Sequence, residues 1–256
     1  MEATVKACWE IENSCNLNCK FCFNAAYRSL ENGNDILLNI NHIINQLHNY
    51  NIEHIIISGG EPLLCKDLFI IINKLELNGF TVSMCTNATL VNALFCQKLK
   101  QTKVQKLTIN IANLINNKSN LIDKNNIIFS SVSTGIQCLV KYDFDITVSD
   151  IVFCIDERLF RDRLRFCQEY NIKKITFTIP ICKYVSSQYM YWSPAQVHEV
   201  ENILYHLESE FPEIDILFNN PDCLLKSCPS QKNIFGITGS NVLPYCLVKR
   251  DIKEFE

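Results

Sequence analysis

Short apolar runs alternate with segments of helical periodicity along the first 181 residues. The apolar runs are rich in β-branched residues, whereas Leu37, Ile40, Ile44 and Leu47 recur at the spacing of one helix face. The predicted strands cover residues 3–12, 54–58, 80–87, 106–112, 144–153 and 173–181. Helices are predicted between them, over residues 37–47, 68–75, 90–99, 131–141 and 158–170.

These six strand–helix units predict an α/β fold in which helices cover a parallel sheet. Six units favour a partial (β/α)6 barrel of the TIM type over a closed eightfold barrel. In such barrels the functional side chains lie at the carboxyl ends of the strands. Candidate functional residues are therefore expected directly after each apolar run.

The regular alternation of apolar runs and helical periodicity ends after residue 181. Residues 193–196 form a capping box with proline at the first helical position, and residues 213–218 predict a last strand. The tail beyond it holds three cysteines and little apolar periodicity, so a bound metal is the expected source of its order. We predict a barrel over residues 1–181 and a small cysteine-rich region over residues 182–256.

Composition narrows the class of protein. The chain has 256 residues, 48% of them hydrophobic, which is enough for a substantial core. The net charge is −3 and no run of Lys or Arg occurs, so neither a nucleic acid nor a membrane surface is an expected partner. No signal peptide or apolar run of membrane-spanning length is visible, and we predict a cytoplasmic protein. Its 14 cysteines are then metal ligands, reactive thiols or small core side chains.

Three cysteines crowd the loop that follows the first predicted strand. Cys15, Cys19 and Cys22 lie in CNLNCKFC, with no histidine or fourth cysteine nearby. Tetrahedral structural zinc sites usually need two pairs of ligands. Three thiolates can instead hold a cubane iron–sulfur cluster whose fourth iron stays open. A chance grouping, or a zinc knuckle with a distant fourth ligand, are the alternatives.

CNLNCKFC resembles the CxxxCxφC signature of the radical S-adenosylmethionine (SAM) enzymes, with Phe21 in the aromatic position. The resemblance implies a [4Fe–4S] cluster on Cys15, Cys19 and Cys22 whose unique iron binds SAM. It implies reductive cleavage of SAM to a 5′-deoxyadenosyl radical, which abstracts a hydrogen atom from the substrate. Phe21 would pack near the adenine.

A second motif follows the second predicted strand. Gly59, Gly60, Glu61 and Pro62 match the GGEP motif that binds the SAM amino group in that family. Small residues let backbone carbonyls approach the ammonium, and a glutamate adds compensating charge. CNLNCKFC and GGEPLL together make the resemblance specific.

Two weaker matches follow the next strands. CTNATL is similar to the TNG segment of the family, with Ala88 in place of the glycine, so Thr86 and Asn87 are expected to face the cavity. Asn110 occupies the place where many members carry a residue near the SAM ribose or methionyl end. Here the usual following aspartate is replaced by Ala112.

The tail segment ITGSNVLPYC resembles the region before a cluster ligand in SPASM and Twitch extensions, with Asn241 at the small-residue position. The resemblance implies an auxiliary iron–sulfur cluster in a single-cluster, Twitch-like region. Its predicted ligands are Cys223, Cys228, Cys246 and, as the candidate fourth, Cys182. Structural zinc, or an open iron that touches substrate, are alternatives. The other cysteines are predicted to be buried as small apolar side chains: Cys8, Cys65, Cys85, Cys96, Cys138, Cys154 and Cys167.

The predicted function is that of a radical SAM enzyme. The opening WEIExxCNLxC followed by GGEPLL most resembles the group that modifies ribosomally made peptides by crosslinking or epimerisation. One alternative is a small-molecule oxidoreductase, for example one that dehydrogenates an alcohol on an aminocyclitol-like substrate. Another is a non-catalytic iron–sulfur or zinc module, against which GGEPLL argues, since an electron carrier needs no site for a SAM amino group.

The implied partners are a peptide or small-molecule substrate and an electron donor such as flavodoxin or ferredoxin. Because the first barrel strand begins within the first ten residues, a peptide substrate is expected to be recognised by a separate protein or at the barrel mouth, or to be short. The sequence identifies no catalytic residue beyond the predicted cluster ligands.

Overall fold

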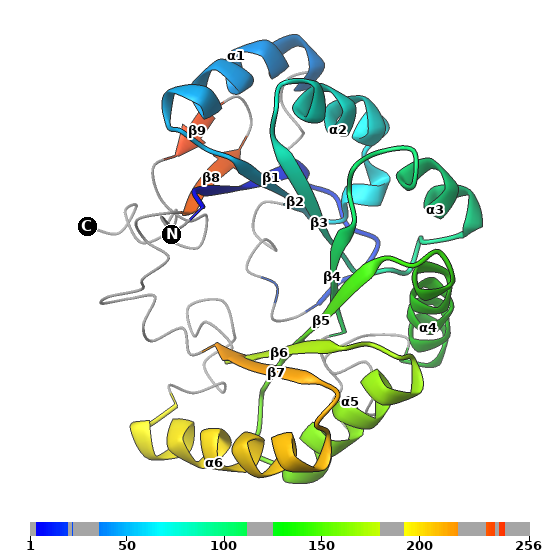
Figure 1. The fold of residues 1–256 in the computed structure, drawn as a ribbon, viewed down its shortest axis with the longest axis vertical. Helices are drawn as coiled ribbons and strands as arrows, with labels where there is room; N and C mark the ends of the chain where they lie inside the picture. The colour runs from blue at the N-terminus through cyan, green and yellow to red at the C-terminus, as the bar shows by residue number, and fades with distance from the viewer. Residues whose placement is uncertain are drawn as a thin grey trace.

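One curved sheet, with helices along its outer side, forms the centre of the protein (Figure 1). The computed structural model describes residues 4–19, 22, 36–111, 125–179, 192–219, 234–238 and 241–243. The nine strands of the sheet lie in the order β7-β6-β5-β4-β3-β2-β1-β8-β9. No described helix is both long and apolar enough to cross a lipid bilayer.

The strands and helices follow one another in the predicted alternation, which confirms a parallel α/β fold. The strands are β1 (Lys6–Glu12), β2 (His54–Gly59), β3 (Thr81–Thr86), β4 (Lys106–Asn110), β5 (Asp145–Ile151), β6 (Lys174–Thr178), β7 (Asp215–Asn219), β8 (Ile234–Thr238) and β9 (Asn241–Leu243). The helices are α1 (Ile36–Asn49), the 3₁₀ turn η2 (Pro62–Leu64), α2 (Leu68–Leu77), α3 (Ala93–Leu99), α4 (Asn125–Lys141), α5 (Glu157–Glu169) and α6 (Pro194–Glu210).

The parallel part of the sheet is larger than the six predicted strands. β7 pairs parallel with β6, and β8 pairs parallel with β1, from Lys6 opposite Ile234 to Glu10 opposite Thr238. Only β9 runs antiparallel among the described strands. The tail was expected to lack regular structure, and this expectation is wrong for the apolar stretch 234–238. The boundary at residue 181 stays a prediction, although β7 and β8 belong to the same sheet.

The two faces of the sheet have opposite character because successive side chains of a strand point to opposite sides. In β1, Ala7, Trp9 and Ile11 are buried in the core under the helices. The facing side of α1 contributes Ile40, Ile43, Ile44 and Leu47. The alternate strand positions face the concave side and are largely polar, including Glu10, Ser58, Thr108, Thr147, Ser149 and Thr176.

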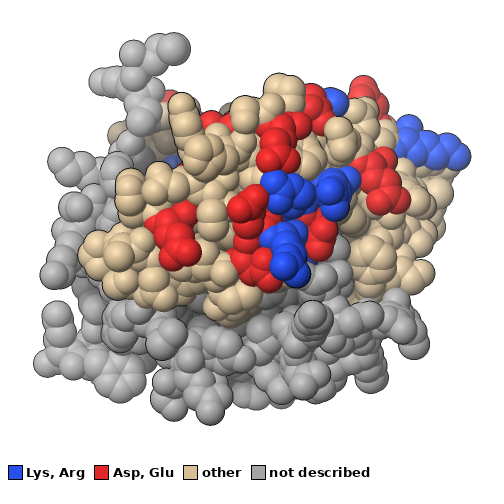
Figure 2. Space-filling view, turned by 90° about the horizontal axis from the view of Figure 1, so that it is seen from below, with Lys and Arg blue, Asp and Glu red and all other residues tan. Residues whose placement is uncertain are grey.

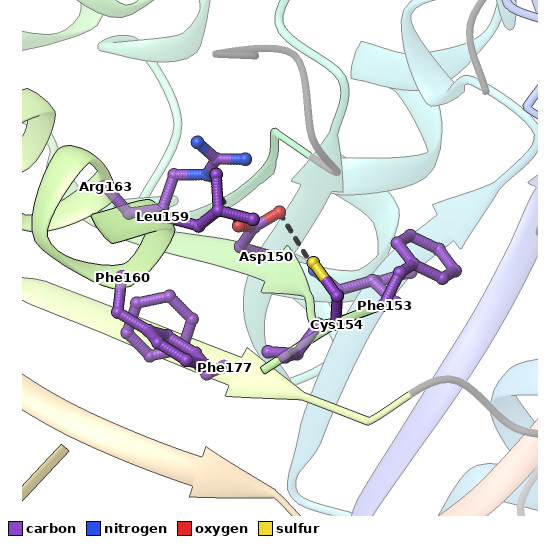
Figure 3. A pocket seen from close by; sticks show the side chains of 9 residues that line it. Asp150, Phe153, Cys154, Leu159, Phe160, Arg163 and Phe177 are labelled. Carbon is purple, nitrogen blue, oxygen red and sulfur yellow. Dashed lines mark hydrogen bonds and ion pairs between the residues drawn. The ribbon is translucent and has the colours of Figure 1, made fainter. Parts of the chain in front are cut away.

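A buried ion pair fastens α5 to the sheet. The Nε of Arg163 lies 2.8 Å from Oδ2 of Asp150, and the two residues are 1% and 4% exposed. Figure 3 shows the side chain of Arg163 extending from α5 to lie beside Asp150 near the end of β5. The outer surface near α5 and α6 carries interleaved acidic and basic side chains (Figure 2), among which Arg161 pairs with Glu157 and Glu210. Exposed pairs of this kind contribute little to stability.

We expect Asp150→Ala to lower the free energy of unfolding by about 3–5 kcal/mol, because it leaves a buried guanidinium without its carboxylate. Chemical denaturation measures the change. The matched control is Glu210→Ala, which removes an exposed partner of Arg161 and should leave stability nearly unchanged. Equal losses in the two variants would contradict this account.

Candidate functional site

The ends of β1 and β2 approach each other unusually closely. The register of the two strands shifts at a bulge between Glu10 and Glu12, which brings Glu12 opposite Gly59. Beyond it, the Gly60 N–H donates to the Glu12 carbonyl at 2.6 Å, and the Glu61 N–H donates to the Ser14 carbonyl at 2.9 Å. The backbone before the first cysteine of the motif is thus bonded directly to the GGEP loop.

This approach explains both glycines of the GGEP loop. A Cβ on Gly59 would lie 2.2 Å from the Glu12 carbonyl oxygen, and the φ of Gly59 is +144°. A Cβ on Gly60 would lie 2.2 Å from the Ser14 carbonyl oxygen. Since neither position has room for a side chain, the glycines are required by the packing of β1 on β2 itself.

Glu61 ties the end of β2 to the end of β3. Its side chain is fully buried and accepts hydrogen bonds from the Thr86 hydroxyl at 2.7 Å, the Asn87 N–H at 2.8 Å and the Leu63 N–H at 3.1 Å. Burial raises the pKa of this carboxyl, and the three hydrogen bonds oppose that rise. With no exposed surface, the carboxylate can act on a ligand only through its charge and through the groups that it positions.

Asn87, directly after β3, connects the end of that strand to the loop that holds the first motif cysteine. Its Nδ2 donates to Oδ1 of Asn16 at 3.0 Å and lies 3.9 Å from Sγ of Cys15. Its Oδ1 accepts from the backbone and hydroxyl of Thr89, and Thr89 in turn accepts from Asn16 at 2.7 Å. The Leu17 N–H also points at the Cys15 sulfur, at 3.4 Å. Such N–H groups stabilise a thiolate or a cluster sulfur.

The three motif cysteines lie in one partly exposed loop. The Cys22 N–H donates to the Cys19 carbonyl at 3.2 Å. None of the three forms a disulfide. Within the described ranges, no three Cys, His, Asp or Glu side chains converge as a metal site. The donor set itself, with three accessible thiols and amide groups beside the first, fits an iron–sulfur cluster with one open iron.

The other predicted site residues divide into two groups. Thr86 is buried against Glu61, Pro62 begins η2, and Asn110 is exposed at the end of β4 opposite Ser149 of β5. The remainder lie outside the described residues: Phe21, Cys182, Cys223, Cys228 and Cys246.

The structure adds Ser14, Asn16 and Thr89 to the candidate site, none of which the sequence analysis selected. Asn16 and Thr89 connect the cysteine loop to the loop after β3. Their only signal in the sequence was their place beside the recognised motifs, which does not reveal a contact between residues 73 positions apart.

Burial of the other cysteines is only partly as predicted. Cys96 and Cys167 are buried. The prediction is wrong for Cys154, which is exposed because β5 ends at Ile151 and leaves this cysteine in the loop before α5. Its sulfur points toward the Asp150 carboxylate (Figure 3). The other four are partly exposed: Cys8, Cys65, Cys85 and Cys138.

The sequence is similar to a known protein family and to curated proteins. Residues 9–157 match the family model described as the radical SAM superfamily. An AdoMet-dependent heme synthase of Methanosarcina barkeri is 30% identical over 180 residues, which make up 68% of this chain and 46% of that protein. The chain spans about half the length of the curated relatives that it matches.

Solved structures share the fold. SuiB of Streptococcus suis superposes with a TM-score of 0.75 at 15% identity, over 97% of this chain and 61% of SuiB. SuiB has also been solved bound to the precursor peptide SuiA. The protein anSMEcpe, solved with bound AdoMet and the peptide Cp18Cys, superposes with a TM-score of 0.64 at 17% identity, over 84% of this chain and 63% of anSMEcpe.

The burial of Glu61 predicts a distinctive pH dependence. Because the pKa of Glu61 is raised on folding, the folded protein holds this proton more tightly than the unfolded chain does. The contribution of Glu61 to stability is therefore greatest at acidic pH and falls as the pH rises through the raised pKa. We expect the wild type to lose stability relative to Glu61→Gln as the pH rises above the ordinary glutamate pKa. Denaturation at a series of pH values measures this difference.

The control for this experiment is Glu53→Gln, which alters an exposed side chain. The stability difference between wild type and this control should stay constant over the same pH range. If Glu61→Gln behaves like the control, Glu61 is not buried as a raised-pKa carboxyl.

Proposed function

Since the chain belongs to the radical SAM superfamily, we propose that it cleaves SAM reductively and abstracts a hydrogen atom from a peptide substrate. The observation that carries this proposal is the joining of three loops at one edge of the sheet. The loop with Cys15, the GGEP loop and the loop with Asn87 are connected by direct hydrogen bonds.

In this proposal Cys15, Cys19 and Cys22 hold a [4Fe–4S] cluster with one open iron. When bound, the cluster supplies the electron that cleaves SAM and so produces the radical. The residues of the chain position the cluster and SAM. Gly59 and Gly60 let the GGEP loop lie directly against the backbone before Cys15, and the two amides near Cys15 stabilise its thiolate.

Glu61 has a positioning role in this site. Its carboxylate fixes Thr86 and the backbone of Asn87, so the Asn87 side chain is held toward the cysteine loop. Its negative charge lies behind the GGEP loop, where it favours a cationic group such as the SAM ammonium. Phe21 and Asn110 are proposed to contact the adenine side and the ribose or methionyl side of SAM.

Two considerations support a peptide substrate. Proteins of the same fold, SuiB and anSMEcpe, have been solved with peptides bound. The concave face of the sheet also carries neighbouring hydroxyls, with Thr108 opposite Thr147 and Ser149 opposite Thr176. Hydroxyl groups both donate and accept, so such a surface can bind the amide groups of a peptide backbone. Crosslinking and epimerisation are both compatible with it.

A small-molecule substrate is the second candidate. The observation that favours it is the sequence relationship to an AdoMet-dependent heme synthase, a protein named for a small-molecule product. The polar concave face accommodates a hydroxylated small molecule by the same hydrogen-bonding chemistry.

For residues 182–256 we propose a Twitch-like auxiliary-cluster region with Cys223, Cys228, Cys246 and Cys182 as ligands. The pairing of β8 with β1 supports this proposal. It returns the tail to the strand that precedes the first cysteine loop, between the segments that carry the tail cysteines. The partners in this proposal are a substrate, an electron donor and, for a peptide with a leader, a separate leader-binding protein.

Iron analysis after anaerobic reconstitution tests the two groups of cysteines. We expect the triple alanine variant of Cys15, Cys19 and Cys22 to lose about four iron atoms and all formation of 5′-deoxyadenosine. The triple variant of Cys223, Cys228 and Cys246 should lose iron but retain 5′-deoxyadenosine formation. Cys154→Ser, at an exposed cysteine outside both groups, should retain full iron content.

Zinc in place of iron in the wild-type tail would contradict the auxiliary cluster alone. A wild-type protein that contains the first cluster yet forms no 5′-deoxyadenosine with SAM and dithionite would contradict the radical function.

Deuterium transfer identifies the substrate class. With a perdeuterated peptide substrate, we expect deuterium to appear in 5′-deoxyadenosine, because the radical takes its hydrogen from the peptide. Crosslinking lowers the peptide mass by a pair of hydrogen atoms, whereas epimerisation in deuterated water with an unlabelled peptide adds deuterium to it. Transfer only from a small molecule would favour the second candidate. Mass spectrometry distinguishes these outcomes.

A further inference from the structure

Two thiols from different helices lie in contact outside the candidate site. The Cys96 thiol donates a hydrogen bond to the Cys138 sulfur, and the two sulfurs are 3.5 Å apart. Cys96 lies in α3, and Cys138 lies in the last turn of α4, 42 positions later in the sequence. Because the sulfurs of a disulfide are about 2.05 Å apart, a movement of about 1.5 Å would allow these two to bond.

The two thiols differ in their access to solvent. Cys96 is fully buried, whereas Cys138 is partly exposed. Burial, and next the hydrogen bond to Cys138, raise the pKa of the Cys96 thiol, so Cys96 stays protonated at neutral pH. An oxidant in solution therefore reaches Cys138 first. Cys96 is held beside it, in the position of a second thiol that resolves the oxidised sulfur.

The pair does not have the further ligands of a metal site. Within the ranges that the structure describes, no three Cys, His, Asp or Glu side chains converge, around this pair or elsewhere. A tetrahedral zinc site needs four ligands, and three of them are protein side chains even where one position stays open. The chemistry that two touching thiols perform without further ligands is the formation of a bond between them.

The helix that carries Cys138 also packs on the loop after β3. Gly135 lies three positions before Cys138, so the two residues share one face of α4. A Cβ on Gly135 would lie 2.2 Å from the Ala88 carbonyl oxygen. Ala88 has a φ of +59°, in the left-handed region that strains an alanine. The backbone of α4 thus lies against a strained residue between Asn87 and Thr89 of the candidate site.

Cys96 is connected to the other end of the same loop. Its N–H donates to the Asn92 carbonyl at 3.0 Å, and the Asn92 side chain caps α3 by accepting from the Phe95 N–H at 3.0 Å. The loop over residues 87–92 therefore ends at the turn that holds Cys96 and packs on the helix that holds Cys138. A bond between the two sulfurs would fix both neighbours of this loop to each other.

We propose that Cys96 and Cys138 are a site of reversible oxidation, at which a hydroperoxide such as hydrogen peroxide produces a disulfide that restrains the loop over residues 87–92. Cys138 takes one oxygen from hydrogen peroxide to form a sulfenic acid, and one water leaves. The Cys96 sulfur then bonds to the Cys138 sulfur, while the Cys96 proton and the sulfenic hydroxyl leave as a second water. The two thiols together lose two electrons, which the peroxide gains. Thiol–disulfide exchange with an added dithiol restores both thiols.

This inference goes beyond the proposed function and does not rest on it, because the bond forms without the cluster or SAM. Peptide mapping of the reconstituted full chain tests it. After treatment with equimolar hydrogen peroxide, we expect trypsin to release the peptides 75–98 and 125–141 joined to each other, and dithiothreitol to separate them. Because the first peptide also contains Cys85, fragmentation in the mass spectrometer has to place the bond at Cys96.

Three variants make the assignment specific. The joined peptides should be lost in Cys138→Ser and in Cys96→Ala, and they should remain in the control Cys154→Ser, which alters an exposed cysteine after β5. Cys138→Ser changes a partly exposed side chain, so it decides the result even if Cys96→Ala fails to fold. The proposal is overturned if Cys96 and Cys138 still react with iodoacetamide while Cys154 is oxidised, or if fragmentation places the bond at Cys85.

Hydrogen exchange tests the effect on the loop separately. In the oxidised wild type we expect the amides of residues 87–92 to exchange several-fold more slowly than in the reduced protein, because a cross-link between α3 and α4 limits local opening. Cys138→Ser treated with the same peroxide should show no such change. If the joined peptides form but exchange in the loop is unaltered, the restraint on the loop is overturned.

Discussion

The backbone contact between the ends of β1 and β2 is the constraint on which the candidate site depends. Two main-chain hydrogen bonds, from Gly60 to Glu12 and from Glu61 to Ser14, hold the start of the cysteine loop against the GGEP loop. This contact is possible only because no side chain occupies positions 59 and 60. It also places Glu61 under the surface, where hydrogen bonds from Thr86 and Asn87 connect the end of β2 to the end of β3. Asn87 follows β3, yet its position relative to Cys15 depends on the contact between β1 and β2.

The same residues consequently have a structural and a proposed functional role. The resemblance to a known family assigns the glycines to the cofactor, whereas the structure shows that the packing of β1 on β2 by itself requires them. Glu61 has a structural role beside the compensating charge predicted for it. A fully buried carboxylate with three donors does not contact a ligand directly. It costs desolvation energy, which the hydrogen bonds from Thr86, Asn87 and Leu63 offset. A substitution at Glu61 would therefore change stability and cofactor geometry together.

Most of the fold could be predicted from the sequence because each strand–helix unit is encoded locally. The periodicity that includes Ile40, Ile44 and Leu47 fixes the buried face of α1, and alternation in β1 fixes which residues enter the core. β8 could not be predicted because a five-residue segment with three large apolar side chains, in a polar tail, does not show which strand edge it will join. Cys154 was misassigned for a related reason, since the end of β5 decides its exposure. The motifs predicted which loops form the candidate site. They could not predict the contact of Asn16 with Thr89, because it depends on how two loops 73 residues apart in the sequence come together in the fold.

Strand order also determines which parts of the chain lie beside β1, the strand that leads into the cysteine loop. β1 has β2 on one side and β8 on the other. On the β2 side, Glu61 bonds the backbone of Asn87, whose side chain bonds Asn16 in the cysteine loop. On the other side, the parallel pairing of β8 with β1 holds the segment 234–238 beside the same strand. The start of the cysteine loop therefore depends on two parts of the chain that are far apart in the sequence, so a change in either part would alter the proposed cluster site.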